Sequence, residues 1–201
     1  NKLWNVSRFV MMHAEKIDDS NNTNFWKKTD LALPDRWINS RLQAVVKDVA
    51  KSIDNYRMDL AAQTLYEFIW NEFCDWYLEL AKPILYGDQS PEKTGTQKVL
   101  VHTLNRLLRL LHPLTPFITE EIWQKVKTLA GQTGDTIMHA SFPVAVDSKI
   151  DQQAIVDLEW IKKAVESVRN IRGEMSISPA KAIPLFVNKA DAEEQRRIND
   201  N

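Results

Sequence analysis

The sequence has little cysteine, little glycine and no long apolar run. Its one cysteine, Cys74, excludes an intramolecular disulfide and a cluster of thiolate metal ligands, and it fits a reducing compartment. Only five of the 201 residues are glycine. Apolar residues recur every three or four positions instead, and this pattern predicts an all-α fold. No apolar run reaches the roughly 18 residues of a membrane span, so we expect a cytoplasmic protein without a membrane segment.

The chain also lacks the short motifs of common catalytic sites. It has no glycine-rich phosphate loop, no G-x-S-x-G, no H-E-x-x-H and no C-x-x-C, and its four histidines stand at unrelated positions. We therefore expect no catalytic residue, no metal site and no cofactor in this chain. A net charge of −1 disfavours binding of nucleic acid by bulk charge, but it leaves local recognition open. The chain starts at Asn1 without a targeting pattern, so we expect it to be part of a larger protein.

Apolar residues at helical spacing predict a helical bundle, followed by the start of a small α/β element. A division after residue 148 gives a helical domain, 1–148, and a second region, 149–201. Polar stretches at Asp18–Asp30 and after Gly87 predict surface loops. The expected helices are Lys2–Glu15, one from Pro34 to about Ile53, Asp59–Tyr86, Gln97–Leu111, Pro116–Ala130, a long one from Asp151 through Ile171, and one beginning in the tail Asp191–Asn201; the expected strand is Ala182–Val187.

The helix expected at Asp59–Tyr86 is rich in aromatic residues, and we interpret it as the central helix of the bundle. Trp70, Phe73 and Trp76 are predicted to be core that fixes this helix in place. Its polar residues recur at steps of three and four, so they share one narrow stripe that must face water or a ligand. Leu78 is the apolar residue within that stripe. The polar members are Thr64, Glu67, Asn71, Asp75, Glu79 and Lys82.

Side chains outside the main apolar faces allow more than one interpretation. Lys2, Asn5 and Phe9 lie opposite the apolar line of the first helix. Phe9 is therefore either a base-stacking platform beside a phosphate contact or core against a second neighbour. His102, between arginines, is predicted at the surface, and Phe117 is predicted to be buried. A basic row on the second helix is either a solvated face or an RNA-backbone track; it consists of Arg36, Arg41, Lys47 and Lys51.

Four segments of the chain carry a family resemblance: Asn1–Val10 (NKLWNVSRFV), Glu72–Pro83 (EFCDWYLELAKP), Leu111–Trp123 (LHPLTPFITEEIW) and Val168–Pro179 (VRNIRGEMSISP). Together they resemble the C-terminal part of bacterial valyl-tRNA synthetases. The third segment is shared in looser form with isoleucyl and leucyl enzymes and supports only the class I editing subgroup. The first two match the valine enzymes closely. The H-I-G-H and K-M-S-K-S signatures of the ATP site are absent from the chain.

The resemblance implies a fold, a reaction and partners. The fold is a helical-bundle anticodon-binding domain, followed by the start of the region that precedes a C-terminal coiled coil. The reaction is that of valine-tRNA ligase, which attaches valine to its tRNA with ATP and Mg. The implied partners are the anticodon loop of valine tRNA and the catalytic and editing domains of the same, monomeric ligase. This chain alone is then expected to be non-catalytic.

The resemblance also assigns candidate RNA-binding residues. It places Lys2, Phe9, Leu78 and Glu79 at the anticodon loop, and Asn5 lies between the first two on the same helix. In physical terms, Phe9 stacks on an unpaired base, Lys2 meets a phosphate, Glu79 accepts hydrogen bonds from an exocyclic amino group, and Leu78 packs against a base face. An alternative stays open: the chain is a helical scaffold or interdomain docking bundle of an isoleucyl- or leucyl-type synthetase with little direct RNA contact.

Overall fold

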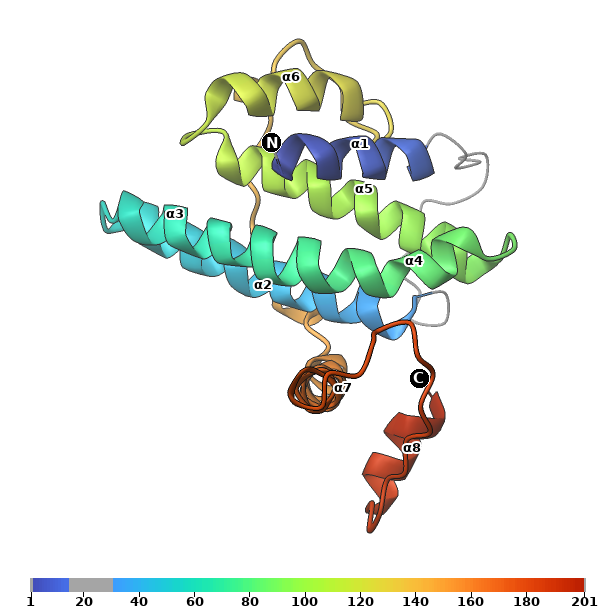
Figure 1. The fold of residues 1–201 in the computed structure, drawn as a ribbon. Coiled ribbons are helices and arrows are strands. Elements are labelled where there is room, and N and C mark those ends of the chain that lie inside the picture. Colours follow the sequence, from blue (N-terminus) through green and yellow to red (C-terminus); the bar gives the residue numbers. More distant parts are fainter. Residues whose placement is uncertain (1, 15–30, 201) are drawn as a thin grey trace. The chain divides into compact units, whose positions relative to one another are not determined.

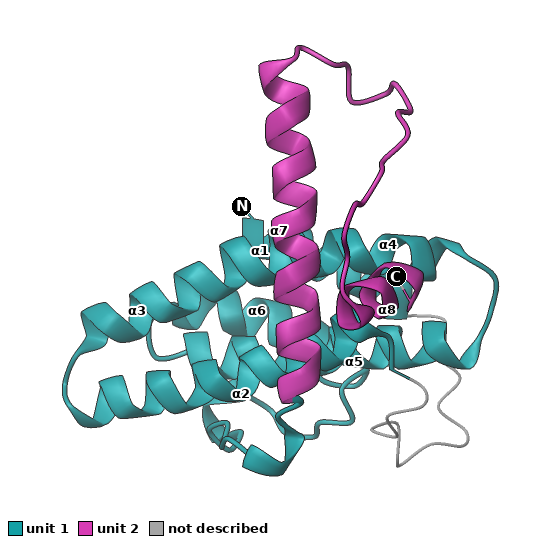
Figure 2. Cartoon of the chain, turned by 90° about the horizontal axis from the view of Figure 1, so that it is seen from below, with its two compact units in different colours: residues 1–151 teal, residues 152–201 magenta. Residues whose placement is uncertain are grey.

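A computed structural model describes residues 2–14 and 31–200 of the chain (Figure 1). Within this part the chain is helical and forms no strand, so the predicted all-α class is confirmed. The chain divides into two compact units, residues 1–151 and 152–201, where the sequence suggested a division after residue 148 (Figure 2). The predicted loop Asp18–Asp30 lies outside the described residues. None of the helices in the described part is both long and apolar enough to cross a membrane.

The first unit is built from α-helices, one π-helix and short 3-10 turns. The second unit holds a long helix and a short one, and the short one confirms the helix predicted in the charged tail. The elements of the first unit are α1 (Lys2–Ala14), α2 (Leu33–Asp54), α3 (Met58–Glu67), the π-helix η2 (Phe68–Tyr77), α4 (Leu78–Tyr86), α5 (Pro91–Leu111), α6 (Pro116–Val126) and the 3-10 turns η3 (Ile137–His139) and η4 (Asp147–Lys149); those of the second are α7 (Gln152–Glu174) and α8 (Ala192–Asp200).

Helix α5 is the centre of the first unit. It contacts α1, α2, α3, α4 and α6, and most of its residues are buried. Figure 1 shows α1 and α6 on one side of α5, and α2 and α3 on the other. The prediction that Asp59–Tyr86 is the central helix is wrong. That run packs one side against α2 and α5, while its other side leaves Tyr66 and Trp70 57% and 37% exposed.

Helix α5 also begins earlier than the sequence suggested. The predicted loop after Gly87 ends at Ser90, because Pro91 already occupies the first turn of the helix. The Ser90 hydroxyl oxygen accepts a hydrogen bond from the Lys93 N–H at 3.1 Å. A serine cap followed by proline is a strong start signal for a helix, and it outweighs the glycine in the segment that follows.

The elements α3, η2 and α4 form one continuous helical run that packs against α2 as an antiparallel hairpin (Figure 1). The predicted helix Asp59–Tyr86 is therefore present, but its middle third is a π-helix. Its turns close with i→i+5 hydrogen bonds and hold more residues than α-helical turns. Pro83 lies inside α4, which ends three residues later at Tyr86, as the helix-breaking property of proline predicts.

A buried hydrogen-bond network joins α2, η2 and α5. The Asp35 carboxylate is fully buried and accepts hydrogen bonds from the Tyr77 and Thr96 hydroxyls, both at 2.7 Å, and from the Ala32 N–H at 3.2 Å. Burial raises the pKa of Asp35 to about 6, although these hydrogen bonds act in the opposite direction. Burial likewise raises the pKa of Tyr77 well above its ordinary value. The network fixes the inward face of η2.

One face of α5 is covered by the irregular segment that precedes α7. Arg106 donates to the Val144 carbonyl oxygen at 2.6 Å, and Arg109 donates to the Ser141 carbonyl oxygen at 3.0 Å. Burial and then the charge of Arg106, with smaller effects from Lys149 and Arg109, lower the pKa of His102 to about 3. The prediction that the face of His102 and its neighbouring arginines lies at the surface is wrong. The segment that covers this face supplies carbonyl acceptors, and these allow Arg106 to be buried.

The second unit lacks the predicted strand. Residues Ala182–Val187 are irregular, and no described residue pairs with them as a strand. The prediction is wrong because a strand needs a neighbour to satisfy its backbone groups, and here Leu185 and Phe186 are exposed instead. Within this unit α8 is tied to α7 by Asp157, which accepts hydrogen bonds from Arg196 at 2.9 Å and from Arg197 at 2.8 Å.

Candidate nucleic-acid interface

Helix α1 runs beside η2 and α4, with a contact at each end. At its first turn, Lys2 Nζ lies 2.8 Å from Asp75 Oδ1. At its last turn, the rings of His13 and Tyr86 have centroids 5.3 Å apart. Residue numbers rise from the first contact to the second in both elements, so the elements run in the same direction. We use the name α1–α4 seam for the candidate residues on these elements, of which Lys2 and Asp75 contact each other directly; they are Lys2, Asn5, Phe9, Asp75, Leu78 and Glu79.

The α1 side of the seam offers one polar and one aromatic side chain. Asn5 is exposed, and Phe9 is half-buried. The Phe9 ring lies against His13, with centroids 4.5 Å apart and planes tilted by 54°. Phe9 is therefore held in place from within its own helix while part of its ring stays accessible. Both interpretations of Phe9 remain compatible with this position.

The α4 side of the seam is acidic. Glu79 is exposed and forms an ion pair with Lys82 at 2.6 Å. Leu78 is only 7% exposed. Its main role in the RNA-free protein is therefore to pack α4 onto the bundle, and only its edge remains for contact with a base. The polar stripe expected on this run does reach the surface, since Glu67, Asn71, Asp75 and Glu79 are all exposed.

Lys2 has two partners on η2. Its ammonium group donates to Asp75 and also lies 4.2 Å from the ring centroid of Trp70, as a cation–π contact. The side chain of Lys2 is 26% exposed and that of Asp75 54%. The predicted phosphate ligand is thus already engaged by an anion and an aromatic face. Sequence reasoning placed Lys2 at the site but missed both partners.

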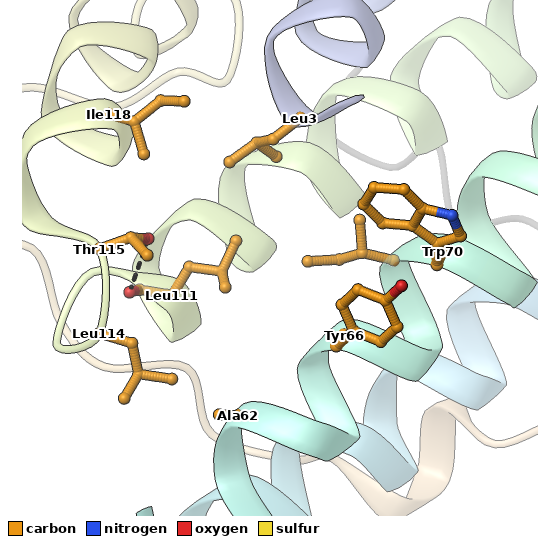
Figure 3. Close-up of a pocket in the computed structure, with 9 residues that line it drawn as sticks. Leu3, Ala62, Tyr66, Trp70, Leu111, Leu114, Thr115 and Ile118 are labelled. Carbon is orange, nitrogen blue, oxygen red and sulfur yellow. Dashed lines mark hydrogen bonds between the residues drawn. The ribbon is translucent and has the colours of Figure 1, made fainter. Parts of the chain in front are cut away.

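An apolar groove of about 340 Å³ opens next to this contact, lined by α1, α3, η2 and the joint between α5 and α6. On one wall the rings of Tyr66 and Trp70 stack with centroids 5.1 Å apart and planes 18° apart. Figure 3 shows Thr115 and Ile118 on the opposite wall, with Leu3 between the walls. The prediction that Trp70 is core is wrong. The i, i+4 spacing of Tyr66 and Trp70 was the sequence signal that could have indicated an exposed aromatic pair.

Phe117 differs even more from its prediction. It is 90% exposed, although the sequence placed it in the core of the fifth helix. Phe117 follows Pro116 in the first turn of α6, and the buried face of that helix is formed by Thr119, Ile122 and Trp123 instead. Together with the groove, it gives the α5–α6 joint an exposed apolar surface.

Three of the four residues in the basic row of α2, Arg36, Arg41 and Lys47, pair with acidic residues of the same unit. Arg41 forms two hydrogen bonds with Glu72 of η2, both at 2.8 Å. Arg36 pairs with Asp151 at 3.1 Å, and Lys47 pairs with Asp147. These three cations thus already have anionic partners within the protein, while Lys51 is exposed. The pairing favours a structural role for Arg36, Arg41 and Lys47 over an RNA-backbone track.

Most of the chain matches a protein-family model. Residues 35–187 match the model described as the anticodon-binding domain of tRNA ligase. The match spans more than half of the chain and includes η2 and α4, with Leu78 and Glu79. Helix α1, which carries Lys2, Asn5 and Phe9, precedes the matched range.

Proposed function

Since the chain belongs to the family of anticodon-binding domains of tRNA ligases, we propose that its α1–α4 seam binds the anticodon loop of valine tRNA. The observation that carries this proposal is the position of α1 beside η2 and α4. Two stretches far apart in sequence, both assigned to RNA by the resemblance, lie on elements joined by the Lys2–Asp75 contact. An exposed polar surface with a supported aromatic ring suits recognition of single-stranded bases.

Each candidate residue has a role that follows from its chemistry. Phe9 stacks on an unpaired base, and Glu79 accepts from an exocyclic amino group once Lys82 turns aside. Asn5 has both donors and an acceptor for a base edge or a ribose hydroxyl. Lys2 contacts a phosphate and carries no sequence information. Leu78 contributes only its exposed edge.

The identity of the amino acid rests on the sequence resemblance. The segments around α1 and α4 are those that resemble valine enzymes closely, and they form the two sides of the seam. In such a ligase, ATP and Mg act in a catalytic domain outside this chain. This chain supplies only the anticodon contact.

Binding of anticodon stem-loops to the whole chain tests this proposal. We expect Phe9→Ala and Glu79→Ala each to weaken binding of a valine anticodon stem-loop by about 1 to 3 kcal/mol, with helical circular dichroism unchanged. Binding is measured by fluorescence anisotropy at fixed salt. A stem-loop with an unrelated anticodon should bind more weakly to the parent and lose little in either variant.

Two matched controls separate the seam from the rest of the surface. Phe142→Ala removes a ring that is 40% exposed on the segment beside α2. Glu121→Ala breaks an exposed i, i+4 ion pair with Lys125 on α6, similar to that of Glu79 with Lys82. Neither control should change the affinity. Equal affinity for the two stem-loops, with no effect of Phe9→Ala or Glu79→Ala, would favour the scaffold function, for which the exposed groove and Phe117 provide a docking surface.

A further inference from the structure

The two partners of Lys2 both belong to the π-helix η2. Trp70 and Asp75 are five residues apart. In an α-helix, at about 100° per residue, positions i and i+5 point about 140° apart and cannot grip one side chain together. In a π-helix the turn closes with i→i+5 hydrogen bonds and holds more residues, so these two side chains point in more similar directions than they would in an α-helix. The ammonium group of Lys2 is within reach of both.

From this geometry we propose that Asp75 is a positioning residue for RNA binding: it holds Lys2 against Trp70 in the RNA-free protein, and an RNA phosphate displaces its carboxylate on binding. The inference rests on the proposed function, in which Lys2 meets a phosphate. A carboxylate and a phosphate compete for the same ammonium group because both are anionic acceptors. Asp75 therefore orients Lys2 and at the same time lowers its affinity for any polyanion.

The contact has the properties that exchange requires. Asp75 receives one hydrogen bond from Lys2, and its side chain is 54% exposed, so water can solvate the carboxylate as it leaves. The neighbouring pair on the same π-helix is different. Glu72 binds Arg41 through two hydrogen bonds, and its side chain is only 18% exposed. Exposed single ion pairs contribute little to stability, so displacing Asp75 costs little.

Trp70 keeps the ammonium group in place during the exchange. The cation–π contact involves the ring face of Trp70, which Tyr66 supports by stacking. This contact does not depend on a negative charge, so Lys2 can retain it while its hydrogen bond passes from the carboxylate to a phosphate oxygen. Phosphate binding then needs no large movement of the lysine side chain.

Substitution of Asp75 tests the proposal by affinity and by salt dependence. We expect Asp75→Asn to bind both the valine and the unrelated stem-loop more tightly, by roughly two- to fivefold at low salt, since an exposed ion pair of that strength is removed from competition. The gain should be equal for the two RNAs, because a phosphate contact carries no sequence information. The plot of log affinity against log salt should become steeper.

A matched control and a double variant show whether Lys2 carries the effect. Glu67→Gln removes the same charge from the same polar stripe, where the carboxylate accepts from Gln63 and does not contact Lys2. It should gain clearly less affinity than Asp75→Asn. In a Lys2→Ala background, Asp75→Asn should gain no more than Glu67→Gln does. Equal gains of Asp75→Asn and Glu67→Gln, or a full gain without Lys2, would overturn the proposal.

A readout on the protein itself separates this inference from the proposed function. In lysine-labelled protein, the ammonium NMR signal of Lys2, assigned by its loss in Lys2→Ala, should shift in Asp75→Asn and on addition of RNA to the parent. If the parent binds no stem-loop, the proposed function fails and this inference fails with it. If the parent binds RNA while the Lys2 signal stays unchanged, only this inference fails.

Discussion

Two aspartates, Asp35 and Asp75, make contacts through the π-helix η2, and they differ in burial. Asp35 accepts from Tyr77 of η2, from Thr96 and from a backbone N–H, and it has no exposed surface. Asp75 belongs to η2 itself, contacts Lys2 and has a side chain that is 54% exposed. Asp35, on the inward side, accepts several hydrogen bonds and is shielded from water. Asp75, on the outward side, accepts one hydrogen bond and is solvated. Burial, more than charge, therefore separates a structural contact from an exchangeable one.

The largest expected effect is loss of the buried contact. Asp35→Ala removes the acceptor of the Tyr77 and Thr96 hydroxyls within the core. A buried donor without an acceptor costs about 1 to 3 kcal/mol, so we expect the free energy of unfolding of the first unit to fall by about 2 to 4 kcal/mol. Urea unfolding followed by circular dichroism measures this. Asp75→Ala is the matched control and should lose less than about 1 kcal/mol; similar losses in the two variants would abolish the distinction.

The pH dependence of stability should also reveal the burial of Asp35. The folded pKa of Asp35 is about 6, above its ordinary value of 3.8, so between these values the folded state binds more protons than the unfolded state. Stability then falls as pH rises from about 4 to 6 and becomes flat above about 7, with a total change of up to about 3 kcal/mol.

The measurement is the difference in unfolding free energy between the parent and Asp35→Asn, taken at a series of pH values. The difference should change in favour of Asp35→Asn as pH rises through that window, because asparagine does not titrate. Parallel profiles of the parent and Asp35→Asn would show that Asp35 is not the group responsible.

Much of the fold follows from local sequence patterns, and the errors share a physical cause. Amphipathic periodicity predicted most of the helices, because each must bury one face. The choice of the central helix failed because aromatic content does not measure burial. The aliphatic and small residues of α5 allow close approach of its neighbours on nearly all sides, while Trp70 and Phe117 remain exposed. The strand Ala182–Val187 failed because its partner is not specified by its own residues.

The candidate site was predicted only in part. Lys2, Asn5, Phe9 and Glu79 do lie near or at the surface of the first unit, and their roles in RNA binding stay predictions. The partners of Lys2 could not be predicted from α-helical spacing, which puts Trp70 and Asp75 about 140° apart, because η2 is a π-helix. The sequence pattern used for the helices assumes α-helical spacing, so it could not indicate a π-helical turn.

The smallest expected effect concerns the two ion pairs that η2 makes with its neighbours. Glu72→Gln weakens the double hydrogen bond with Arg41, which is partly buried, so we expect a loss of about 1 to 2 kcal/mol in unfolding free energy. Asp75→Asn weakens an exposed single contact and should cost about 0.2 to 1 kcal/mol.

In the stability assay, Glu72→Gln should have the larger effect of the two variants. In RNA binding, Asp75→Asn should have the larger effect: it gains affinity, while Glu72→Gln stays at the level of the Glu67→Gln charge control. Urea unfolding and stem-loop anisotropy on the same preparations measure both orders. If Glu72→Gln had the larger effect in both assays, both ion pairs would serve stability alone. Opposite orders are expected because the inward side of η2 holds the bundle, whereas its outward side exchanges an ion pair within the protein for one with RNA.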